Sequence, residues 1–118
     1  MVRFTIVKGQ ASVDDIIEFG KVYDEIVGSL QGKYVFVADT TQGNWLSFEA
    51  RITFGQLARE LEDKYIDRLM VNYLVINNPL VHTVMKGINI FLKPKVPQYI
   101  FETLEQALEV ANSKVKSF

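Results

Sequence analysis

The sequence predicts an α/β domain built on a largely parallel sheet. Short, β-favouring apolar runs alternate with stretches whose apolar residues recur every three to four positions, which is the period of an amphipathic helix. Two of the runs, at 34–38 and 71–76, are almost wholly apolar, as is typical of strands covered on both faces. Strands that alternate with helices favour a layered structure with right-handed crossovers. We therefore expect a βαβαβαβα order and a mostly parallel four-stranded sheet with amphipathic helices.

The first strand and the first helix are predicted before residue 33. Phe4 and Ile6 alternate with polar residues in a strand that ends at Gly9. A helix then begins at Ser12, whose hydroxyl can accept a hydrogen bond from a backbone N–H in the first turn. Its apolar positions run to Gly32 and leave an acidic outer face. They are Ile16, Ile17, Phe19, Val22, Tyr23, Ile26, Val27 and Leu30.

The central part of the chain contains one buried strand and one segment with two interpretations. The strand at 34–38 ends in the polar stretch 39–44. After it, an apolar stripe with helical spacing favours a helix from Ser47 to about Leu69. The alternative is a strand through this stretch, because apolar and polar residues also alternate up to Phe54. The helix would then begin later, at the capping box Thr53-Phe54-Gly55-Gln56.

The last part of the chain repeats the alternation of strand and helix. Asn77-Asn78-Pro79 stops the strand at 71–76 and is a strong helix start, which predicts a third helix up to Leu92. Ile90 alone lies opposite the apolar stripe of this helix. A short strand follows at 98–101. The spacing of Thr103 and Gln106 is a capping box for the last helix, whose buried face is expected to hold Leu104, Ala107, Leu108 and Ala111.

Length and charge restrict the class of protein. A chain of 118 residues is expected to form a single domain over 1–118, because single cores typically form at roughly 100 to 150 residues. A net charge of -1 argues against nucleic acid as a partner. Apolar runs are far shorter than the roughly 20 residues of a membrane-spanning helix. The start does not resemble a signal peptide and cysteine is absent, so we expect a cytoplasmic protein.

Polar residues follow the predicted strands at the edge where parallel sheets bind ligands. We predict one ligand or partner rim there, made of Asp39, Thr40, Thr41, Asn77 and Asn78, with Trp45 as an anchor. Glu102 and Thr103 follow the last strand at this edge. The structural alternatives are that the Asp accepts backbone N–H bonds, that Asn78 caps a helix and that the Trp covers the sheet. Asp39 and Asn77 at opposite ends of the sheet would contradict the rim.

Four segments resemble a known family. They are Val37-Ala38-Asp39-Thr40-Thr41, Ser47-Phe48-Glu49-Ala50-Arg51, Val75-Ile76-Asn77-Asn78-Pro79-Leu80 and Ile100-Phe101-Glu102-Thr103-Leu104-Glu105-Gln106-Ala107-Leu108. Over roughly residues 34 to 111 the chain resembles the SpoIIAA-like, STAS/SEC14-type family of small α/β proteins, above all bacterial members of undetermined function. Such proteins often begin with two strands, whereas only one is predicted here. The resemblance implies a non-enzymatic regulatory module that binds a protein.

The resemblance also implies a place for phosphorylation. Anti-sigma-factor antagonists of this type bind a kinase and carry a phosphorylatable Ser or Thr at the start of the helix after a central strand. Their Asp-Ser-Ser/Thr-Gly pattern is absent here, and Ser47, Thr40 and Thr41 are the residues that this region offers as acceptors. The SEC14 side of the resemblance implies the alternative function, a carrier for an apolar small molecule.

Catalytic and metal chemistry find little support in the residues. His82 is the single histidine, so a site built from His pairs is impossible. Glycine-rich phosphate motifs are absent, and no serine stands in a nucleophile elbow. We expect no cofactor and no metal. A hydrolase that uses Asp39 or His82 is the least favoured function.

A second surface is suggested by the third predicted helix. Ile90 is apolar on a polar arc near Lys86, which makes the pair a candidate interface for an unknown protein partner or for a homodimer. Lys86, Lys93 and Lys95 also form a small cluster of cations. Its structural explanation is that cations near a helix C-terminus complement the helix dipole.

Overall fold

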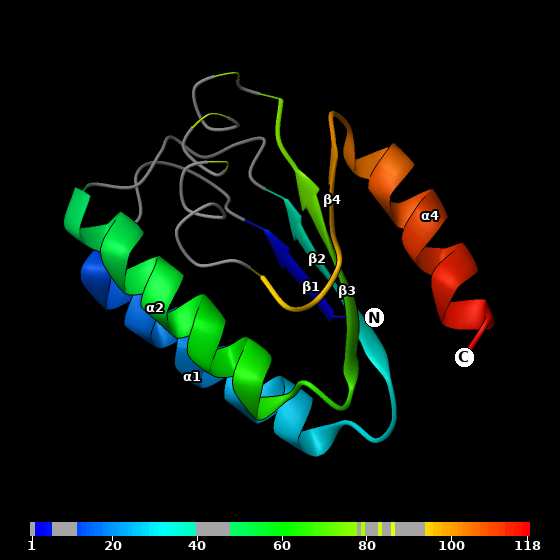
Figure 1. Cartoon of the computed structure of the whole chain (residues 1–118), viewed down its shortest axis with the longest axis horizontal. Coiled ribbons are helices and arrows are strands. Elements are labelled where there is room, and N and C mark those ends of the chain that lie inside the picture. The colour runs from blue at the N-terminus through cyan, green and yellow to red at the C-terminus, as the bar shows by residue number, and fades with distance from the viewer. Residues whose placement is uncertain are drawn as a thin grey trace.

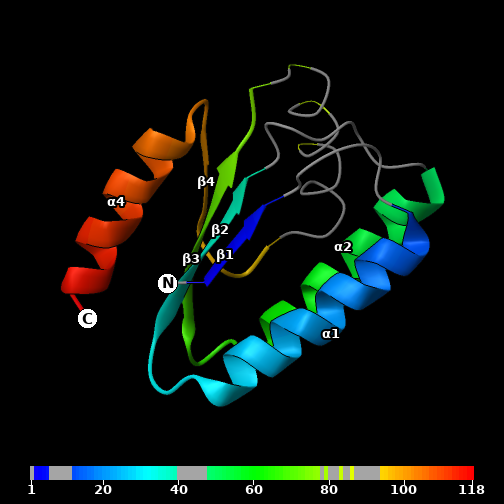
Figure 2. The same cartoon turned by 180° about the vertical axis from the view of Figure 1, so that it is seen from behind.

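The sheet lies between two helical layers (Figure 1). The computed structural model describes residues 2–5, 12–39, 48–77, 79, 83, 86 and 94–118. Helices α1 (Val13–Ser29) and α2 (Phe48–Lys64) lie side by side on one face of the sheet. Helix α4 (Leu104–Lys116) covers the other face, as the view from behind in Figure 2 also shows.

The strands run in parallel through the sheet. Their order is β1-β2-β3-β4, and each strand pairs in parallel with the next. Their bounds are Val2–Thr5 for β1, Tyr34–Asp39 for β2, Leu69–Val75 for β3 and Gln98–Phe101 for β4. Parallel neighbours need a crossover along a face of the sheet, which α1 provides between β1 and β2 and α2 provides between β2 and β3. The predicted parallel α/β architecture is confirmed.

Strand β2 is buried on both faces, as its apolar sequence predicts. Tyr34, Phe36 and Ala38 belong to the core beneath α1 and α2. Val35 and Val37 belong to a second core, which Ala107 and Ala111 of α4 close from the other side. Successive side chains of a strand point to opposite faces, so the apolar residues 34–38 of this strand can pack against both helical layers.

Helix α1 begins with the capping box that its sequence offers. Ser12 Oγ accepts from the N–H of Asp15 at 3.2 Å, and Asp15 Oδ2 accepts from the N–H of Ser12 at 2.9 Å. Further along, Gly20 allows α2 to approach closely, because a Cβ atom there would lie 2.9 Å from Leu57 Cδ1. The two helices therefore share one core on this face of the sheet.

The second helix is shorter than predicted. It ends at Lys64, residues 65–68 form a turn, and Leu69 already belongs to β3, where it pairs with Tyr34. The apolar stripe in the sequence continues beyond the end of the helix, because Tyr65 in the turn packs in the same core as Leu61 of the helix. Residues 48–54 are helical, so the alternative strand interpretation of this stretch was wrong.

The other element boundaries agree with the sequence to within a few residues. Strand β3 starts two residues earlier than predicted, and α4 has the predicted capping box. Of the predicted third helix the structure describes Pro79, Thr83 and Lys86, each of which is helical. The rest of that helix, and positions 6–9 of the first strand, lie outside the described residues. Within the described part of the chain, no helix is long and apolar enough to cross a membrane.

Two buried tyrosines join α1 to β2. Tyr23 Oη and Tyr34 Oη lie 2.6 Å apart in a hydrogen bond. Burial, followed by this bond, raises the pKa of Tyr23 far above its ordinary value of 10.0. Burial also raises the pKa of Tyr34, although the bond from its partner acts in the opposite direction. The folded protein therefore holds both protons more tightly than the unfolded chain does.

The tyrosine pair predicts a loss of stability in alkali. The unfolded chain releases these protons above about pH 10, so it gains free energy there that the folded protein cannot share. The contribution of the pair to stability should be constant below that pH and should then fall by about 1.4 kcal/mol per pH unit for each tyrosine. Urea unfolding between pH 8 and pH 11 measures the slope. Tyr23→Phe should have a shallower slope, and identical slopes would contradict the prediction.

Candidate functional site

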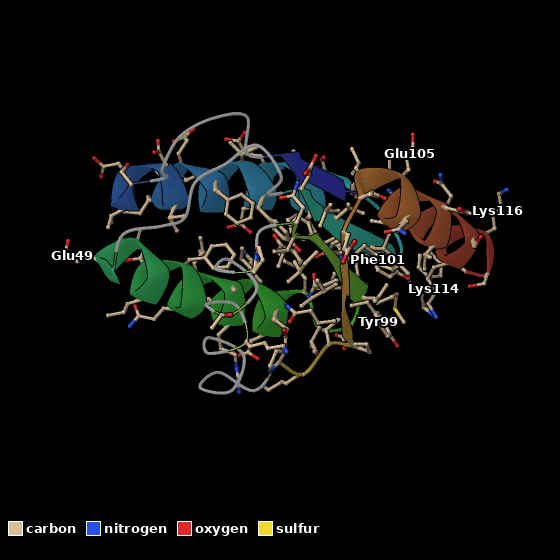
Figure 3. All side chains as sticks on the ribbon, turned by 90° about the horizontal axis from the view of Figure 1, so that it is seen from above. Glu49, Tyr99, Phe101, Glu105, Lys114 and Lys116 are labelled. Atoms are coloured by element: carbon tan, nitrogen blue, oxygen red, sulfur yellow. The ribbon has the colours of Figure 1, made fainter. Side chains whose placement is uncertain are left out.

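The strands end in one row across the sheet. Thr5 pairs with Asp39, Asp39 with Val75, and Val75 with Phe101. The ladder continues one step further, because the N–H of Ile76 donates to the carbonyl oxygen of Phe101 at 2.8 Å. Figure 3 looks onto this edge and labels Phe101 in β4 and Glu105 near the start of α4.

Asp39 and Asn77 lie at the same edge of the sheet. Asn77 is two residues beyond Val75, which is the register partner of Asp39. The arrangement that would have contradicted a shared rim is therefore absent for these two residues. Whether the edge binds a ligand or a partner remains a prediction.

Asp39 is an inner residue of this edge. Only 4% of its surface is exposed, and it takes part in a contact within the protein. Side chains alternate along β2, so Asp39 lies on the same face as Val35 and Val37, the face that α4 covers. A macromolecular partner would reach little of this carboxylate directly. Asp39 can stabilise the edge from the interior of the protein, while other side chains form the surface of the edge.

Asn77, Glu102 and Thr103 are exposed at the edge. Thr103 is occupied with capping α4: its Oγ1 accepts from the N–H of Gln106 at 3.3 Å, and Gln106 Oε1 accepts from the N–H of Thr103 at 3.4 Å. The amide of Asn77 and the carboxylate of Glu102 therefore offer hydrogen-bonding groups to a partner. We use "the rim" below for Asp39, Asn77 and Glu102.

Several predicted residues lie outside the described residues. They are Thr40, Thr41, Trp45, Ser47, Asn78, His82 and Ile90. Their roles in the binding edge predicted from the sequence, as phosphate acceptors or at an interface remain predictions. Lys86 is described and exposed, and so is nearby Thr83, whose Oγ1 donates to the carbonyl oxygen of Pro79 at 3.0 Å.

Lys95 forms an ion pair with α2. Its Nζ lies 2.8 Å from Oδ1 of Asp63 in α2, and this lysine together with Arg59 holds the pKa of Asp63 below its ordinary value. The cation thus joins the segment before β4 to α2.

The amino-terminal edge of the sheet is held by a network that sequence reasoning missed. Arg68 donates to the carbonyl oxygens of Leu30 at 2.7 Å and Val27 at 2.8 Å, and its guanidinium lies over the rings of Tyr34 and Tyr65. Helix α1 has no basic residue in its last turn, and Arg68 supplies the positive charge there. The absence of a basic residue in that turn is the signal that the sequence offers for this contact.

Asp24 joins α1 to α2 at the same edge. Its Oδ1 accepts from the hydroxyl of Tyr65 and from Lys64 Nζ, the latter at 2.9 Å. The bond from Tyr65, followed by that from Lys64, keeps the pKa of Asp24 below its ordinary value. Asp24, Lys64 and Tyr65 are thus used for internal contacts at this edge.

Glu62 is a buried carboxylate, with 7% of its surface exposed. Its Oε1 accepts from the backbone N–H groups of Lys95 and Val96, the latter at 3.2 Å. Two backbone donors thus satisfy a charge that would otherwise be costly to bury. The residue fixes the segment that leads into β4.

The described residues were also considered as metal ligands. Among positions 12–39, 48–77 and 94–118, with the few described residues between them, no three His, Cys, Asp or Glu side chains form a group that could hold a metal ion. Four carboxylates, those of Asp15, Asp24, Glu62 and Asp63, bind backbone N–H groups, lysines, an arginine and a tyrosine.

Comparison with known proteins identifies the fold. No protein-family model matches the sequence, and no curated protein matches it. One similar solved structure is an uncharacterized protein from the DUF3478 family with a SpoIIAA-like fold, from Shewanella loihica PV-4. The two chains are 16% identical and superpose with a TM-score of 0.64 over 92% of this chain and 82% of the other. The chain has a SpoIIAA-like α/β fold.

Proposed function

We propose that the chain is a non-enzymatic, regulatory protein-interaction module whose partner contacts the rim. The row formed by Thr5, Asp39, Val75 and Phe101 carries the proposal, because it brings the strand ends to one edge. Crevices outside the carboxyl ends of parallel strands are the usual binding places of such sheets. The SpoIIAA-like resemblance supplies the functional class, and the rim supplies the place.

The contrast between the two edges of the sheet supports this choice. At the amino-terminal edge, Asp24, Lys64 and Arg68 are engaged in bonds that hold the helices to the sheet. At the carboxyl edge, Asn77 and Glu102 present exposed polar groups. Binding at the rim would leave the packing of the domain intact.

Regulation by phosphate is part of the proposal. Thr40 and Thr41 directly follow Asp39 in the sequence, and Ser47 directly precedes α2. In the sequence, a phosphate on any of them would add close to two negative charges just after Asp39 or just before α2. That charge would change the affinity for a partner without any need to refold the domain.

Arginine substitutions on the two edges test the place of binding. Asn77→Arg and Glu102→Arg put a large cation at the rim, and Gln31→Arg and Asp67→Arg make matched changes at exposed positions of the amino-terminal edge. We expect the rim variants to weaken capture of the native partner about tenfold, since a misplaced charge in an interface is costly. The amino-terminal variants should capture it as the unmodified chain does. Equal losses at both edges, or full retention by the rim variants, would overturn the proposal.

A further inference from the structure

Helix α1 has a line of exposed apolar side chains that the core does not use. Val22, Ile26 and Leu30, the last of which is the C-terminal cap residue, are 40%, 43% and 38% exposed. Residues four positions apart lie above one another on a helix, so the three form one continuous strip. The side of α1 that packs in the core is a different one, formed by Ile16, Gly20, Tyr23 and Val27.

The strip lies on the flank of α1 that faces away from α2. Gly20 and Asp24 mark the side toward α2, since they meet Leu57 and Lys64 of that helix. At 100° per residue, Ile26 falls about 120° from Gly20 around the helix axis. Figure 2 shows α1 in front of α2, so this outer flank belongs to the surface of the molecule.

An acidic line runs beside the apolar strip. Asp14, Glu18 and Glu25 are exposed and fall within about 40° of one another around the helix. Glu18 and Glu25 stand one helical turn before and after Val22, so the two lines touch. Helix α1 holds five carboxylates against one lysine, whereas the whole chain has a net charge of -1. We define the α1 flank as the apolar strip together with this acidic line.

The charge of the α1 flank excludes several occupants. A symmetric dimer through this surface would bring the acidic lines of both copies into one interface, because a two-fold interface contains the same patch from each subunit. Nucleic acids and anionic membranes carry the same sign of charge. The lysines of α4, Lys114 and Lys116, lie in the opposite helical layer, as Figure 3 shows. An occupant must combine apolar side chains with positive charge.

We propose that the α1 flank binds a cationic amphipathic helix of another protein. Apolar residues spaced by four form a ridge that packs into the groove of a second helix, and the acidic line pairs with lysines or arginines beside that groove. This surface is separate from the rim. The proposal therefore goes beyond the proposed function, and either of the two can fail alone.

A synthetic peptide tests the chemistry of the occupant. The probe has about 18 residues, five helical turns, with leucines along one side and lysines elsewhere. A scrambled peptide of the same composition has the same charge but no apolar face. Fluorescence anisotropy should show that the intact chain binds the amphipathic peptide at least about tenfold more tightly than the scrambled one. Equal binding of the two peptides would mean unspecific charge attraction and would overturn the proposal.

Matched variants test the place of binding. Ile26→Gln and Glu25→Lys should each weaken peptide binding about fivefold to tenfold. Ile52→Gln and Glu60→Lys change an equally exposed isoleucine and an exposed glutamate on α2, and they should leave binding unchanged. Equal losses in the α2 variants would overturn the proposal. So would self-association in sedimentation that Ile26→Gln abolishes, because a second copy would then occupy the flank.

Discussion

Glu62→Ala is expected to lower the free energy of unfolding by about 3 kcal/mol. The substitution removes the carboxylate that accepts from the N–H groups of Lys95 and Val96. Hydrogen bonds to a charged group contribute about 1.5 to 3 kcal/mol each, and Val96 is buried, so water cannot easily replace the lost acceptor. The entry to β4 should loosen first. Hydrogen exchange should therefore quicken at residues 95–98 more than in α1.

Urea unfolding with Glu60→Ala as the control measures this effect. Glu60 is on the same helix but exposed, so its removal should leave stability nearly unchanged. A loss in Glu62→Ala no larger than that in the control would mean that the buried carboxylate does not hold the segment. Glu62→Gln separates the effect of charge from that of shape, because glutamine keeps one acceptor oxygen. Its free energy of unfolding should lie between those of the wild type and the alanine variant.

Arg68→Met is expected to destabilise the protein by about 2 kcal/mol. Methionine keeps an unbranched apolar stem but loses both bonds to the last carbonyl groups of α1 and the contacts with the two tyrosine rings. The C-terminus of α1 should fray in consequence. Thermal unfolding followed by circular dichroism measures the loss.

Arg59→Met is the matched control for the arginine. Arg59 also forms an ion pair, with Asp63 at 3.5 Å, but this pair is on the exposed surface of α2. Exposed pairs contribute little to stability, so the control should unfold at a temperature much closer to that of the wild type. Equal losses in the two variants would show that capping of α1 by Arg68 is unimportant.

Local signals made much of the fold predictable. Ser12 and Thr103 act as helix caps because the residues that complete each capping box lie only three positions away. The burial of residues 34–38 in β2 follows from their uninterrupted apolar sequence. The end of α2 was missed because Tyr65 continues the apolar stripe beyond the helix, and only its packing in the core shows that a turn begins there.

The sequence predicted the position of the candidate site, but it did not predict that Asp39 is buried. The topology alone places Asp39 and Asn77 at one edge, because all strand pairs are parallel. The burial of Asp39 depends on α4, which is formed at the far end of the sequence and covers that face of the sheet. Arg68 and Glu62 were missed for the same reason, since their partners come from other elements.

Native mass spectrometry of the protein purified from its own host tests the central claim most directly. The account predicts a second polypeptide bound to the chain, and the same complex for Gln31→Arg but not for Asn77→Arg. A retained apolar small molecule in place of a polypeptide would contradict the account and favour the carrier function. A chain that is always isolated alone would also contradict it.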